Sequence, residues 1–203
     1  MAGDEDVQQQ YPTAHTVEDF AHNIAAVRAR ITAAAERAGR DPAAIRLLPV
    51  SKTVPADRIR LAVAAGCREL GENKVQEIVR KQPALAGLGV SWSMIGHLQT
   101  NKARDVVAYA SEFQALDRLK VAAALERRLQ AAGRSLDVYV QVNTSAEDSK
   151  FGLPPGELPA FLAALAPYET LRVRGLMTLA IFTPDAERVP RQQGARQFGR
   201  SRR

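Results

Sequence analysis

The sequence contains a single cysteine, Cys67, among 203 residues. One cysteine cannot form an internal disulfide framework or, alone, a thiolate zinc site. We expect Cys67 to be a small buried side chain, because the sequence points to no base that would activate it. The chain also lacks the run of about 18 apolar residues that a membrane span needs, and its acidic, Gln-rich start is unlike a signal peptide. The sequence therefore predicts a cytoplasmic protein without a membrane partner.

The common phosphate and nucleophile motifs are missing too. There is no G-x-x-x-x-G-K-[ST] loop, no G-x-G-x-x-G after the first predicted strand and no G-x-S-x-G elbow. Functions based on ATP, a dinucleotide or a serine nucleophile therefore lose their main support. No metal is assigned, because the other histidines, His15 and His22, lie in or near the first predicted helix and not at ligand spacing from His97.

Charges are balanced except at the carboxyl end. The formal net charge is +6, from 28 basic and 22 acidic residues. Residues 188–203 contain six arginines and no acidic residue, so the first 187 residues hold 22 of each sign. A protein that binds nucleic acid specifically needs a basic face on its folded domain. No specific nucleic-acid partner is expected, and non-specific binding through the arginine tail is a remote alternative.

The apolar pattern predicts one α/β domain. Apolar residues at helical spacing indicate a helix from Val17 to Arg37, with Thr16 as its cap. Strands and helices then alternate, and the mostly apolar strands favour a parallel sheet that is covered on both sides. The predicted strands are Ile45 to Val50, Arg68 to Leu70, Trp92 to Ile95, Glu112 to Leu116, Val138 to Val142 and Arg172 to Met177. The predicted helices between them are Pro55 to Ala65, Lys74 to Lys81, Asn101 to Tyr109, Leu119 to Ala132 and Glu157 to Ala166.

Polar residues follow four of these strands, and their position favours a (β/α) barrel over an open doubly wound sheet. Lys52, Asn73, His97 and Asn143 each stand at or just after the carboxyl end of a different predicted strand. In a barrel these ends meet on one face, where active sites form, whereas an open sheet would gather only two or three at its switch point. We therefore expect one site at this face.

Lys52 is the residue in this set with the most specific chemistry. It ends the apolar run from Leu47, and burial would favour a neutral amine that can form a Schiff base with an aldehyde cofactor. Asn73 could hydrogen-bond a phenolic oxygen of such a cofactor, and His97 could donate to a ring substituent or relay a proton. Each residue also has a plain structural interpretation: a solvated loop lysine, a helix cap, and a histidine that satisfies a loop carbonyl.

Five motifs in order between about residues 20 and 185 closely resemble the YggS/PROSC family of pyridoxal phosphate homeostasis proteins. They are Val50-Ser51-Lys52, Gly71-Glu72-Asn73-Lys74-Val75-Gln76-Glu77, Trp92 followed by Ile95-Gly96-His97-Leu98-Gln99-Thr100-Asn101-Lys102, Val140-Gln141-Val142-Asn143 running to Lys150-Phe151-Gly152, and Arg174-Gly175-Leu176-Met177. The resemblance implies a barrel like the amino-terminal domain of alanine racemase.

The same resemblance implies a function. Pyridoxal 5'-phosphate (PLP) would be held as a Schiff base on Lys52, with Asn73 as the polar residue near the cofactor and Met177 lining its pocket. The family is thought to buffer PLP and deliver it to PLP-dependent apoenzymes, without established catalytic turnover. The alternative is a PLP-dependent racemase, which needs a second acid/base group on the opposite cofactor face. None of the tyrosines in the predicted elements of this domain is an obvious candidate.

Two departures from the family pattern are visible. Ser93 replaces a histidine that usually follows the tryptophan. After Phe182 the chain lacks the family's Ser-Met-Gly-Met-Ser-like segment and Val-Arg-x-Gly-like segment, so the barrel is expected to miss about its last two strands. The expected organisation is a flexible tail at residues 1–15, an incomplete barrel domain at residues 16–187, and an unrelated arginine-rich tail at residues 188–203. We expect weak cofactor retention, and a shifted reading frame after about Glu187 is one hypothesis for the tail.

Overall fold

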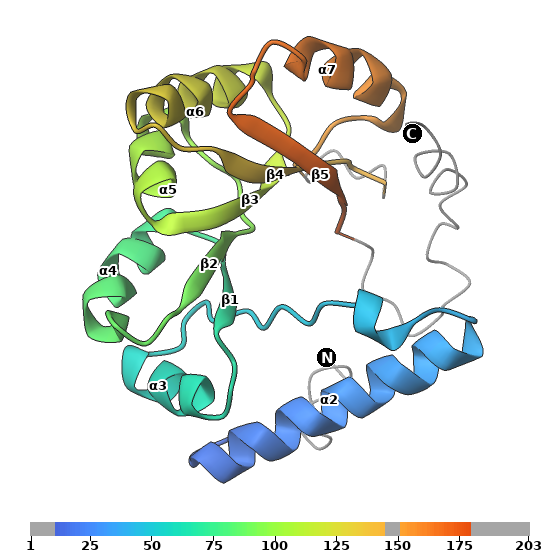
Figure 1. The fold of residues 1–203 in the computed structure, drawn as a ribbon, viewed down its shortest axis with the longest axis vertical. Helices are drawn as coiled ribbons and strands as arrows, with labels where there is room; N and C mark the ends of the chain where they lie inside the picture. Colours follow the sequence, from blue (N-terminus) through green and yellow to red (C-terminus); the bar gives the residue numbers. More distant parts are fainter. Residues whose placement is uncertain (1–10, 145–150, 180–203) are drawn as a thin grey trace.

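The computed structural model describes residues 11–144 and 151–179, which form a five-stranded sheet with helices around it (Figure 1). The α-helices are α2 (Val17–Arg37), α3 (Ala56–Ala64), α4 (Val75–Leu85), α5 (Ala103–Tyr109), α6 (Leu119–Ala131) and α7 (Leu158–Leu165). The strands are β1 (Glu69–Glu72), β2 (Ser91–Met94), β3 (Ala110–Leu116), β4 (Leu136–Gln141) and β5 (Leu171–Met177). Short 3-10 helices are η1 (Pro42–Ala44), η2 (Thr100–Lys102) and η3 (Pro155–Glu157).

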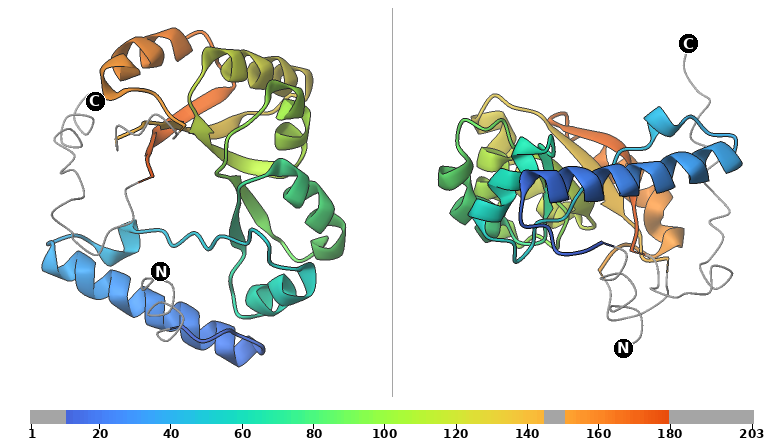
Figure 2. Two further views of the ribbon diagram at one scale, coloured as in Figure 1. Left: turned by 180° about the vertical axis from the view of Figure 1, so that it is seen from behind. Right: turned by 90° about the horizontal axis from the view of Figure 1, so that it is seen from below.

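The strands follow one another in the order β1-β2-β3-β4-β5, and every neighbouring pair is parallel. Figure 1 shows them along an arc, with α3 to α7 on the outer side and α2 across the open side from α5 and α6. The view from behind in Figure 2 shows the same arrangement. Consecutive strand order with the helices of these units on the outside is typical of a (β/α) barrel, whereas an open doubly wound sheet has helices on both faces. The predicted fold class is confirmed.

The first predicted strand, Ile45 to Val50, is wrong in extent, because only Val50 pairs, through one parallel bridge to Gly71. The Pro49 carbonyl accepts from Gly71 N–H at 2.8 Å, and Ser51 N–H donates to the Gly71 carbonyl at 2.9 Å. The next rung of this parallel ladder would need an N–H at residue 49, and proline has none. Pro49 therefore ends the pairing.

The other predicted elements are confirmed to within a few residues. α2 spans the predicted residues, and Thr16 caps it: the Thr16 hydroxyl accepts from Asp19 N–H at 3.1 Å, and the Asp19 carboxylate accepts from Thr16 N–H at 3.0 Å. α4 continues past its predicted end at Lys81, because Leu85 extends the buried face of the helix.

The core lies between the outer face of the sheet and the helices that cover it. Val138 and Val140 of β4, Phe113 of β3, and Leu125 and Leu129 of α6 are all fully buried there. Alternate strand residues thus face the helices, as the period of a strand requires. The residues between them face the concave side of the arc.

Cys67 is buried just before β1, as predicted, and burial raises the pKa of its thiol. A buried thiol with a raised pKa is a packed side chain and not a nucleophile.

The predicted tails lie mostly outside the described residues. Of the amino-terminal one, residues 11–15 are described: the Ala14 carbonyl accepts from Arg58 at 2.8 Å, and the Pro12 carbonyl accepts from Asn23 at 2.9 Å. Residues 188–203 lie wholly outside. Within the two described ranges, no helix has the length and apolar character to cross a membrane.

Candidate functional site

Parallel strand direction brings the predicted site residues to one edge of the sheet. Lys52 follows the Val50 bridge, Asn73 directly follows β1, and His97 comes three residues after β2. Met177 is the last residue of β5. The carboxyl ends of all the strands point the same way, so these residues surround the carboxyl edge of the arc.

Lys52 is exposed, so the expectation that burial makes its amine nucleophilic is wrong. It lies in a tight turn, closed by a hydrogen bond of 3.0 Å from Val54 N–H to the Ser51 carbonyl. Thr53 occupies the third position of this turn with a φ of 63°. Few β-branched residues adopt this left-handed conformation, which persists only where the surroundings impose it. The turn that carries Lys52 therefore has a conformation that its surroundings impose.

A buried ion pair lies directly beneath this turn. Lys81 of α4 is 2% exposed and Glu72 of β1 is fully buried. The Lys81 ammonium donates to Glu72 Oε1 at 2.6 Å and to the Ser51 carbonyl at 2.8 Å. The Ser51 hydroxyl donates to the same Glu72 oxygen at 2.7 Å. Ser51 precedes Lys52 in the chain, and Glu72 precedes Asn73. The hydrogen bonds of this network therefore connect the backbone beside Lys52 with the backbone beside Asn73.

Asn73 is exposed and lies against Gly96. A Cβ atom at Gly96 would stand only 2.0 Å from the backbone oxygen of Asn73. The end of β2 is also bonded to the end of β1, since Ile95 N–H donates to the Glu72 carbonyl at 2.9 Å. Only glycine allows this approach of the two backbones, so the Asn73 and His97 loops fit each other closely.

His97 belongs to a cluster from three loops. Its ring stacks on that of Phe151, with 3.9 Å between the ring centroids. Arg118, which follows β3, places Nη2 at 3.0 Å from His97 Nε2 and donates to the Leu98 carbonyl at 2.8 Å. Asp117 Oδ2 lies 3.9 Å from His97 Nδ1. Because a guanidinium only donates, Nε2 is assigned as the acceptor and the ring proton to Nδ1.

The electrostatics of this cluster favour a neutral imidazole. Burial lowers the pKa of His97, and the positive charge of Arg118 lowers it further, while Asp117 opposes both. His97 can thus accept at one nitrogen and donate at the other near neutral pH.

Met177 is partly buried and packs against the core. Its carbonyl accepts from Val142 N–H at 2.9 Å, which ties the end of β5 to the end of β4. The Thr144 and Thr178 hydroxyls lie 2.8 Å apart just beyond these ends. Asn143 N–H donates to the Leu153 carbonyl at 2.9 Å. This part of the edge supplies mainly backbone and hydroxyl groups.

A polar network covers the concave side of the arc, away from the helices. Glu112 of β3 accepts from Arg46, from Ser93 at 2.6 Å and from Gln114 at 2.5 Å. Burial would raise the pKa of Glu112, but the hydrogen bonds from these partners outweigh it and lower the pKa. Ser93, the departure from the family pattern, is therefore buried in a structural network.

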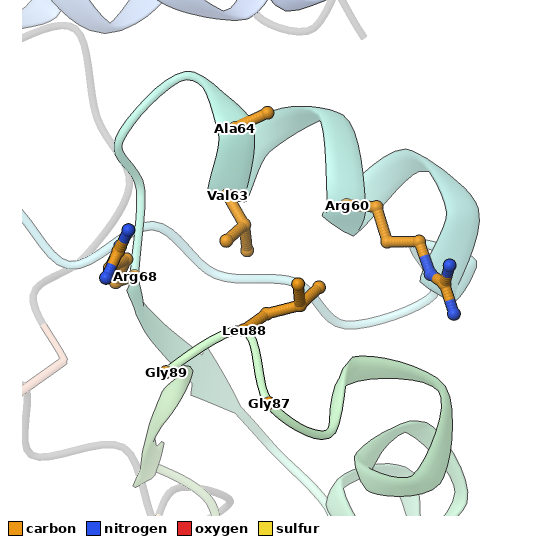
Figure 3. Close-up of a pocket in the computed structure, with 7 residues that line it drawn as sticks. All are labelled: Arg60, Val63, Ala64, Arg68, Gly87, Leu88 and Gly89. Atoms are coloured by element: carbon orange, nitrogen blue, oxygen red, sulfur yellow. The ribbon is translucent and has the colours of Figure 1, made fainter.

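A pocket lies at the other end of the sheet (Figure 3). It has a volume of about 440 Å³ and is lined by residues that come before β1 and β2. Figure 3 shows Val63 and Leu88 at its middle, with the guanidinium groups of Arg60 and Arg68 on opposite sides. A ligand site needs polar groups that converge. This pocket lacks them, and it is remote from the carboxyl edge.

The residues of the chain match the family described as "Alanine racemase, N-terminal domain" over positions 20–202. The chain belongs to this family. A "Pyridoxal phosphate homeostasis protein" of Pseudomonas aeruginosa is 48% identical over 170 residues, which are 84% of this chain and 73% of the relative. The protein of the same name from Escherichia coli is 45% identical over 185 residues, which cover 90% of this chain and 78% of the relative.

Solved structures agree with the family assignment. The PipY protein of Synechococcus elongatus, solved with PLP bound, has a TM-score of 0.72 and 34% identity over 83% of this chain and 74% of that one. Alanine racemase of Streptomyces lavendulae has a TM-score of 0.56 at 19% identity, covering 75% of this chain and 40% of that one, a likeness of fold alone. As a member of the alanine racemase N-terminal domain family, the chain has the fold that its motifs imply.

Sequence reasoning did not find Lys81, Glu72, Arg118 and Phe151 as residues of this site. One signal was available for Lys81, which occupies the buried face of α4, three residues after Ile78. A lysine on an apolar helical face needs a buried partner. Nothing local indicates the other contacts, because their partners are distant in sequence.

Gly96→Ala is expected to separate the Asn73 and His97 loops, because the added methyl group would collide with backbone that cannot rotate away. We expect a loss of about 1–3 kcal/mol in the free energy of unfolding, measured with urea. The matched control is Gly156→Ala, where a Cβ meets nothing within 4 Å. Equal stability of the two variants would contradict the close approach.

Arg118→Met is expected to raise the pKa of His97, because it removes a nearby positive charge. In the folded wild type the pKa of His97 lies below its ordinary value of 6.5. Neutral His97 therefore stabilises the fold fully at a pH above its pKa in the unfolded state. This contribution is lost as the pH falls from there through the pKa of His97 in the folded state. An NMR titration of the His97 ring in the wild type and in Arg118→Met measures the two pKa values, with Arg104→Met, a change of an exposed arginine in α5, as control. No difference between Arg118→Met and Arg104→Met would contradict the role of Arg118.

Proposed function

We propose that this chain binds PLP at the carboxyl edge of its sheet, with the cofactor attached as a Schiff base to Lys52, and that it serves intracellular PLP homeostasis. The observation that carries the proposal is the exposed amine of Lys52, held on an imposed turn at the edge where barrel proteins place their sites. The relatives named as PLP homeostasis proteins, and the PLP-bound PipY structure, support it.

The side chains at this edge suit the chemistry of PLP. The primary amine of Lys52 can condense with an aldehyde, forming a C=N bond and releasing water. Asn73 offers a donor and an acceptor, and His97 offers its Nδ1–H donor. Arg118 offers a cation for an anionic group, and Met177 offers an apolar contact. PLP supplies an aldehyde, a phosphate and an aromatic ring, so these groups match its functional groups.

A role as carrier is favoured over racemisation. A racemase needs a second acid/base group across the cofactor from the lysine. Tyr109 ends α5 just before β3, and Tyr168 comes just before β5, so both lie at the amino edge of the sheet. Tyr139 lies within β4. None of these three tyrosines follows the carboxyl end of a strand, and Cys67 is buried before β1.

Several further features belong to the same proposal. The carrier works in the cytoplasm and delivers PLP to PLP-dependent apoenzymes. Its PLP-binding barrel domain comprises residues 16–187, between an amino-terminal segment, residues 1–15, and an arginine-rich segment, residues 188–203. Neither a metal nor a specific nucleic acid is needed for this function.

Titration of the chain with PLP is expected to change the absorption of the cofactor from that of an aldehyde to that of an imine. Lys52→Ala should abolish this change and weaken binding at least about tenfold, or about 1.4 kcal/mol. Lys74→Ala, which removes another exposed lysine beside Asn73, is the matched control and should bind as the wild type does.

Retention of the imine spectrum by Lys52→Ala would contradict the attachment site. The same PLP-loaded protein, incubated with L-alanine and D-alanine, should interconvert neither. Turnover that Lys52→Ala abolishes would contradict the carrier proposal and favour the racemase.

A further inference from the structure

The ammonium group of Lys81 is bonded to the backbone of the turn that carries Lys52. Lys81 reaches across from α4, and three oxygens surround its Nζ: Glu72 Oε1 at 2.6 Å, the Ser51 carbonyl at 2.8 Å and Glu77 Oε2 at 3.4 Å. The first two contacts are hydrogen bonds, and the third is a longer ion pair. Lys81 is thereby fixed in one position.

The contact with Ser51 occurs where the strand pairing has ended. Pro49 interrupts the ladder on one side, and beyond Ser51 the chain turns away from β1. The Ser51 carbonyl accepts from Val54 N–H within the turn and from Lys81 beneath it. The backbone that leads into Lys52 therefore rests on one bridge, on the hydrogen bond from the Ser51 hydroxyl to Glu72 and on the Lys81 side chain, and no regular strand supports it.

Stability alone is a weak reason for such a pair. Removing two charges from water costs several kcal/mol per ion, and apolar residues of similar volume often stabilise a fold as well or better. Glu72 Oε2, moreover, is buried without a hydrogen-bond partner among the described residues. A buried ion pair with an unsatisfied oxygen beside a strained turn is better explained by a role in positioning the turn than by stability.

We propose that Lys81, oriented by Glu72, is a positioning residue for PLP attachment: it holds the turn Ser51–Val54 in the conformation that presents the Lys52 amine at the carboxyl edge of the sheet. Lys81 does not touch the cofactor itself. The effect on the cofactor rests on the proposed function, whereas the effect on the turn does not. The two parts are therefore measured separately.

The test is a double variant, Glu72→Met with Lys81→Met, which removes both charges together and leaves no unpaired buried ion. Amide hydrogen exchange of residues 51–54 reports on the turn, and equilibrium dialysis with PLP reports on attachment. We expect cooperative unfolding as in the wild type, exchange in the turn faster by about tenfold or more, and PLP binding weaker by about tenfold or more. Arg80→Met, which removes an exposed ion pair with Glu77 on the same helix, is the control and should change neither by more than about twofold.

Wild-type exchange rates at residues 51–54 in the double variant would overturn the proposal. If that variant does not fold, the wild type still decides, because the Val54 amide should be protected as strongly as those of β1, and rapid exchange there would overturn the proposal. If the wild type binds no PLP, the proposed function fails, while the exchange rates still decide the role of Lys81. If PLP binds and the turn loosens without loss of affinity, the positioning role is overturned.

Discussion

The buried ammonium of Lys81 is the interaction on which the geometry of the proposed site depends. It bonds Glu72 at the end of β1 and the Ser51 carbonyl at the start of the turn. Removing one partner of a buried ion pair typically costs about 3–5 kcal/mol, a large part of the roughly 5–15 kcal/mol that stabilises a domain. The same contact thus secures α4 against the sheet and fixes the segment that bears Lys52. The same contact helps to place Asn73, because Asn73 directly follows Glu72, the last residue of β1.

Strand direction supplies the rest of the arrangement. Because β1 to β5 are parallel, the loops that follow them all lie at one edge of the sheet. Gly96 lets the Asn73 and His97 loops approach each other there. The His97 cluster adds Arg118 and Phe151 from later loops. At the other edge lie the pocket of Figure 3 and the residues that come before β1 and β2. In barrels generally, the amino edge serves stability and the carboxyl edge serves function.

Much of the fold could be predicted from the sequence, because periodicity records which face of an element is buried. α2 and the strands β1 to β5 follow from it. The apolar run from Ile45 predicts a strand, but the missing N–H of Pro49 limits its pairing to Val50. The position of Lys52 at the end of that run predicts a buried lysine. The direction of its side chain depends instead on the turn Ser51–Val54, and Lys52 is exposed. The pairing of Lys81 with Glu72 depends on how α4 packs, which no local pattern specifies.

The most direct test of this account is borohydride reduction of the chain after incubation with PLP, followed by mass mapping of the peptides. Borohydride supplies the hydride that converts an imine to a stable amine, so it records where the cofactor was attached. The account predicts one adduct per chain, on Lys52, and none in Lys52→Ala. Labelling scattered over several exposed lysines, or equal labelling of Lys52→Ala, would contradict it.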